Sequence, residues 1–144
     1  MPLIRRIAAA AILSAIAAVP VAAHKAAAPP KAQEYHVEFV FPNNDAYVGT
    51  MTLTIAQGRV AGQMAIDTPH KVTGTVAGTL KATTLALDYP YEIAGDQPCT
   101  GRVTVNATFN ATRTEAKGTT HADGCGDPMD GQFTMTKSPA RRGR

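Results

Sequence analysis

The five residues Met51-Thr52-Leu53-Thr54-Ile55 alternate between apolar and polar side chains. Successive side chains of a β-strand point to opposite faces of a sheet, so one face of this stretch is apolar and the other carries the two threonines. Such alternation is typical of an antiparallel strand with one buried and one solvated face. The stretch therefore predicts a sheet whose apolar face covers a core.

The same period of two recurs further along the chain. It is present within residues 60–66, 85–91 and 103–109, and no helical 3.6-residue stripe follows residue 23. Valine and threonine, which suit a pleated surface, are abundant, and clusters of Gly, Pro, Asn and Asp between the alternating segments indicate turns. The expected strands are 34–41, 46–56, 59–66, 71–79, 83–91, 100–109, 113–121 and 131–137.

Eight short strands joined mostly by tight turns predict a single small antiparallel up-and-down barrel, because closure removes the exposed sheet edges. A two-sheet β-sandwich is the alternative. An eight-stranded barrel has room either for a small ligand or for its own side chains, and the sequence leaves both outcomes open. The side chains expected to line the interior include Met64, Leu85, Leu87, Tyr89, Val105 and Phe109.

Glycines recur inside the expected strands, as in the shared pattern G-x-V-A-G at 58–62 and 74–78. A phosphate-binding loop would need a strand-to-helix junction, which this sequence lacks. Glycines within strands more often mark bulges, bends at barrel corners or close approach of another group to the backbone. We expect that structural role here.

The N-terminal residues have the pattern of a signal peptide. Arg5 and Arg6 precede an apolar stretch over 7–19 that ends in small residues, so we expect cleavage after Ala23. This predicts export to the periplasm or out of the cell, with no membrane span after cleavage. The expected organisation is a signal peptide (1–23), an Ala/Pro/Lys tether (24–33), the barrel domain (34–137) and a basic tail (138–144).

The two cysteines, Cys99 and Cys125, are expected to form one disulfide, as an isolated pair in an exported domain usually does. A redox or metal site is the alternative. A redox site would show a C-x-x-C motif, which is absent, and two thiolates would need further ligands to hold a metal. The structural disulfide is therefore the stronger interpretation.

The charge distribution argues against a nucleic-acid partner. The 144-residue chain carries a formal net charge of +3, but only seven of its 14 basic residues lie in 34–137, together with all 11 acidic ones. Nucleic-acid-binding domains concentrate lysine and arginine on their folded surface. The expected domain has the opposite balance.

No nucleophilic motif stands out. The only serine after residue 23 is Ser138, outside any G-x-S-x-G sequence, and the cysteines are expected to be bonded. We predict no catalytic residue, metal or cofactor. The densest polar segment, a candidate loop, comprises His121, Asp123, Asp127 and Asp130, and it lacks the spacing of an EF-hand. The alternative is a small periplasmic enzyme in which His121 meets Asp123 or Asp127 at a barrel mouth.

The order of parts resembles small secreted bacterial barrels of the lipocalin-like (calycin) kind. These parts are a Tyr47-Val48-Gly49 entry, G-x-V-x-G hairpins, and a Cys125-Gly126 pair before a closing Gly-Gln-Phe-Thr-Met strand at 131–135. The resemblance implies a barrel that binds a small apolar ligand or another protein. The expected function is thus an exported, non-catalytic binding or interaction protein.

Overall fold

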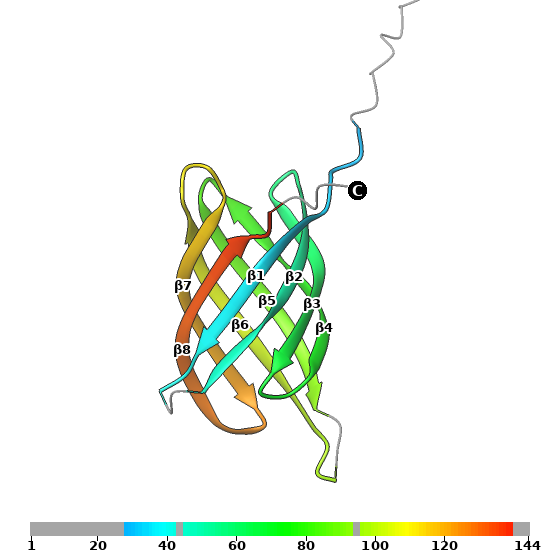
Figure 1. Ribbon diagram of the computed structural model, residues 1–144, viewed down its shortest axis with the longest axis vertical. Coiled ribbons are helices and arrows are strands. Elements are labelled where there is room, and N and C mark those ends of the chain that lie inside the picture. Colours follow the sequence, from blue (N-terminus) through cyan, green and yellow to red (C-terminus); the bar gives the residue numbers. More distant parts are fainter. Residues whose placement is uncertain (1–27, 43–44, 94–95, 140–144) are drawn as a thin grey trace, which may run out of the picture.

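The computed structural model describes residues 28–42, 45–93 and 96–139, and these ranges contain strands but no helix (Figure 1). The expected signal peptide lies outside the described residues. Within them, no helix has the length and apolar character needed to cross a membrane. The strands are β1 (Gln33–Val40), β2 (Ala46–Ala56), β3 (Arg59–Thr68), β4 (Val72–Lys81), β5 (Thr84–Ile93), β6 (Cys99–Phe109), β7 (Glu115–Gly124) and β8 (Gly126–Lys137).

The eight strands form a closed barrel in sequence order, which confirms the predicted up-and-down architecture. Each strand pairs antiparallel with the next, and β1 also pairs with β8 from Tyr35↔Lys137 to Val40↔Gln132. This last pairing satisfies the backbone groups that would otherwise form two open edges. The two-sheet alternative is not formed.

The two ends of the barrel differ. The connections β1–β2, β3–β4, β5–β6 and β7–β8 lie at one end, which we call the disulfide end because it carries the cysteine pair. The other end, here the terminal end, holds the β2–β3, β4–β5 and β6–β7 turns (Figure 1). The first and last described segments also meet there, where the Ser138 amide donates to the Glu34 carbonyl over 2.9 Å.

One turn is shorter than expected. The strands expected at 113–121 and 131–137 leave residues 122–130 between them, but β7 continues through Gly124 and β8 begins at Gly126. The chain reverses at Cys125 because the flanking glycines adopt φ values of +111° and +110°, which side-chain-bearing residues rarely tolerate. Pro128 is tolerated in β8 because β1 pairs with this strand only as far as Gln132. No β1 residue lies opposite Pro128, so β1 lacks no hydrogen bond from the N–H that proline does not have.

The terminal half of the barrel is filled by its own side chains. The rings of Tyr35 and Phe109 lie 6.1 Å apart there, and Leu53, Leu80 and Leu85 are buried around them. Nearer the middle, Thr120 is the only buried polar residue of the described ranges, and its hydroxyl donates to the Thr104 carbonyl. The side chains expected in the interior are all buried: Met64, Leu85, Leu87, Tyr89, Val105 and Phe109.

Close contact between strands requires glycine at several interior positions, and Gly62 provides a test. A Cβ atom at Gly62 would lie 2.0 Å from the Thr52 carbonyl oxygen, so a methyl group there forces β2 and β3 apart. We expect Gly62→Ala to lower the free energy of unfolding by about 2 kcal/mol in urea denaturation. The adjacent Ala61→Val, on the exposed face, should change it by less than about 0.5 kcal/mol. Equal effects of the two substitutions would contradict this interpretation.

Candidate functional site

A cavity of about 70 Å³ lies inside the barrel at the disulfide end. Among the described residues that line it none is charged, and their only side-chain oxygen atoms are three tyrosine hydroxyls. The lining residues are Phe39, Phe41, Tyr47, Ile66, Val72, Tyr89, Tyr91, Ile93, Val103, Ala122 and Met129. Every one of the eight strands contributes at least one of them, so only the closed barrel brings them together.

Three aromatic rings of this cavity lie against strand glycines. A Cβ atom at Gly74 would come within 3.0 Å of the Tyr89 ring, and one at Gly101 within 2.4 Å of the Tyr91 ring. A Cβ atom at Gly131 would lie 2.9 Å from the Phe41 ring. These glycines therefore allow aromatic rings to approach the backbone closely, one of the roles expected for glycines within strands. Each one lets a large ring lie directly on the barrel wall.

Burial decreases toward the mouth of the cavity. Phe39 and Tyr89 are buried, whereas Tyr47, Ile93 and Met129 are half-buried. Tyr47 meets Phe41 edge-to-face, with ring centroids 5.7 Å apart. The cavity thus has an aromatic inner wall and a partly exposed rim.

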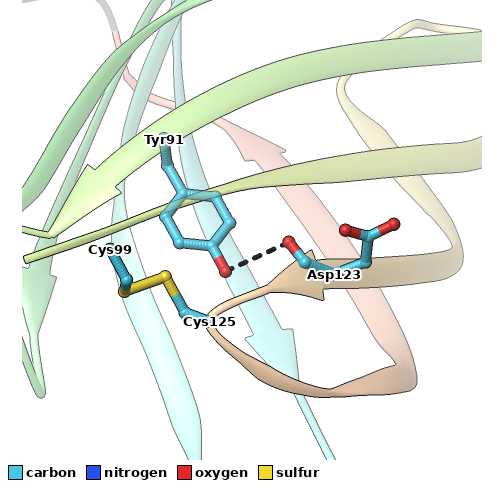
Figure 2. Close-up of a disulfide and its surroundings, with 4 residues drawn as sticks. All are labelled: Tyr91, Cys99, Asp123 and Cys125. Atoms are coloured by element: carbon cyan, nitrogen blue, oxygen red, sulfur yellow. Dashed lines mark hydrogen bonds between the residues drawn. A yellow bond between two sulfur atoms is a disulfide. The ribbon is translucent and has the colours of Figure 1, made fainter.

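The disulfide fixes one side of this rim. Cys99, at the start of β6, is bonded to Cys125 in the β7–β8 turn, with their Cα atoms 5.6 Å apart. Figure 2 shows the Tyr91 ring beside this bond, with its hydroxyl donating to the Asp123 carbonyl over 3.4 Å. The disulfide and Tyr91 together connect β5, β6 and β7 at the cavity mouth.

The hydroxyls of Tyr89 and Tyr91 remain neutral at physiological pH. Burial raises the pKa of Tyr89 far above its ordinary value of 10.0, and the nearby Tyr91 raises it further. Burial also raises the pKa of Tyr91, while a backbone hydrogen bond from Cys125 lowers it in part. A neutral phenol both donates and accepts hydrogen bonds, so these groups can serve neutral polar atoms.

The polar segment that was expected to be a loop belongs to the paired strands β7 and β8. His121 and Asp123 lie on β7, and Asp127 and Asp130 lie on β8. His121 Nδ1 lies 2.7 Å from Asp130 Oδ1 on the outer wall, with side chains 47% and 88% exposed. His121 thus meets Asp130, not Asp123 or Asp127 as the enzyme alternative expects. The described ranges contain no group of three or more residues arranged to hold a metal ion.

Only one of the six residues expected in the interior lines the cavity. Tyr89 does so, whereas the other five belong to the packed part of the core. Of the additional lining residues, Ile66, Tyr91 and Val103 lie on the apolar face of alternating segments, a signal that was visible in the sequence. Met129 lies between the strands expected at 113–121 and 131–137, in a segment predicted to connect them.

Comparison of the chain with known proteins does not assign it to a family. No protein-family model matches the chain, and no curated protein matches its sequence. The functional conclusion therefore rests on the geometry of the cavity.

Removing the disulfide should destabilise the protein strongly. The bond closes a segment with a sequence separation of 26, for which chain entropy gives about 3–4 kcal/mol. We expect the double variant Cys99→Ala/Cys125→Ala to lose this amount in urea denaturation, with faster amide exchange at the cavity rim. Chemically reduced wild-type protein is the control and should behave alike. A loss below about 1 kcal/mol would show that the other rim contacts suffice.

Alkaline pH should also destabilise the fold. The folded state holds the Tyr89 proton more tightly than the unfolded chain does, so its contribution is complete below pH 10.0 and is lost as the pH rises above that value. We expect the free energy of unfolding to decline above pH 10.0, and Tyr89→Phe to make that decline shallower. Denaturation at several pH values measures both slopes; identical slopes for the two proteins would refute the role of Tyr89.

Proposed function

We propose that the protein is an exported, non-catalytic binding protein of the lipocalin-like kind, whose cavity holds the apolar part of a small molecule. The supporting observation is the cavity lining, which combines uncharged aromatic and aliphatic side chains with three hydroxyls. Small-molecule sites are commonly concave and mostly apolar, with a few polar groups that orient the ligand. The His121–Asp130 pair, by contrast, lies on the outer wall with both side chains exposed.

The size of the cavity limits what enters it. Its 70 Å³ exceeds the roughly 10–15 Å³ that one water needs, yet it is smaller than the about 150 Å³ of an apolar cavity that binds benzene. A single ring or short chain would therefore displace the rim slightly. Ile93 and Met129 are half-buried there, and the unbranched methionine side chain adapts readily to such changes.

The cysteine chemistry supports export. A disulfide persists in oxidising compartments such as the periplasm or the extracellular space, which agrees with the signal-peptide pattern of residues 1–23. The resemblance to lipocalin-like barrels also implies protein partners. Such a partner would use the same cavity by inserting an apolar side chain through its rim.

Binding of toluene, a purely apolar probe, tests this proposal. Ala122 lines the cavity, so Ala122→Leu should fill it and weaken toluene binding by at least about tenfold in isothermal titration calorimetry. The matched control is Ala86→Leu, which adds the same group on the outer wall and should leave the affinity unchanged. Failure of the wild-type protein to bind toluene, or equal affinities in all three proteins, would disprove the proposed site.

A further inference from the structure

We infer that the cavity takes a neutral small molecule with a hydroxyl or carbonyl oxygen, and that the Tyr89 hydroxyl recognises this oxygen through a hydrogen bond. The inference rests on the proposed function and adds the chemical class of the ligand. It depends on three features: the position of Tyr89, the state of its hydroxyl, and the charge of the surrounding residues.

Tyr89 is held firmly in the cavity wall. Its side chain is only 6% exposed, and its ring lies against Gly74. The centroid of its ring also lies 6.1 Å from that of Tyr91, with the ring planes tilted by 36°. A ring confined in this way presents its hydroxyl in a nearly fixed direction.

The Tyr89 hydroxyl has no hydrogen-bond partner within the described part of the chain, unlike that of Tyr91, which bonds to Asp123. In the same ranges, no side-chain oxygen or nitrogen is both sealed from solvent and unpaired. The Tyr89 oxygen is therefore reached by solvent despite the burial of its residue. A ligand oxygen at this point would replace that solvent with a direct hydrogen bond, which an apolar ligand cannot make and without which the hydroxyl would be buried unfavourably.

The lining selects against charged ligands. Its described residues include no Lys, Arg or His to pair with an anion, and no Asp or Glu to pair with a cation. Transferring an unpaired ion into an apolar cavity carries a large desolvation penalty. An aromatic lining can attract an organic cation through its ring faces, but such a cation would leave Tyr89 without a partner. A neutral oxygen satisfies both the apolar lining and the hydroxyl.

The experiment compares p-cresol with p-xylene, which has the same shape but a methyl group in place of the hydroxyl. Calorimetry on the oxidised protein gives the affinity for each, first in the wild type and then in Tyr89→Phe. We expect the ratio of p-cresol affinity to p-xylene affinity to fall about fivefold in Tyr89→Phe, as the loss of one hydrogen bond implies. Tyr35→Phe, a matched substitution at the terminal end, should leave this ratio unchanged.

The outcomes separate the two proposals. If Tyr89→Phe leaves the ratio unchanged while p-xylene binds, the cavity is a binding site but the inferred role of Tyr89 is wrong. If neither probe binds the wild type, the proposed function itself fails. Tighter binding of p-toluate or tetramethylammonium than of p-cresol would overturn the neutral ligand class. Binding of p-xylene by Tyr89→Phe also shows that this variant folds.

Discussion

Pairing of β1 with β8 closes the sheet, and the interior depends on this closure. Once closed, the barrel has no free edge, and alternate side chains of every strand must share one narrow space. At the terminal end, Tyr35 and Phe109 project into that space and fill it with the surrounding leucines. A cavity arises only where the interior side chains leave the centre unfilled.

At the disulfide end, glycines allow the interior side chains to leave the centre of the barrel unfilled. Because Gly74, Gly101 and Gly131 have no Cβ atom, the rings of Tyr89, Tyr91 and Phe41 lie directly against the wall. Large residues thus line the barrel without occupying its centre. The disulfide fixes the neighbouring rim, and the Tyr89 hydroxyl stays open to solvent, with no hydrogen-bond partner among the residues that the structure describes.

Much of the fold was predictable because it depends on local pattern. Alternation at Met51–Ile55 and in the related segments predicted the strands and much of the core. The disulfide was predicted because the chain has only two cysteines. The β7–β8 turn was predicted too long, because Gly, Asp and Pro at 124–128 are typical of turns. The actual turn is short because two glycines adopt positive φ values, and β8 accepts Pro128 because β1 pairs with it only as far as Gln132. The cavity was not predictable, because Phe39, Tyr47 and Met129 meet only through the register of the closed barrel.

The most direct measurement of the central claim is the position of a bound ligand. Intermolecular nuclear Overhauser effects between p-cresol and the oxidised protein would locate it in solution. A ligand in the cavity contacts the Met129 methyl group and the ring protons of Tyr89 and Phe39. Contacts confined to outer-wall residues such as Thr104 or His121, or no contacts at saturating ligand, would show that the cavity is merely a packing defect.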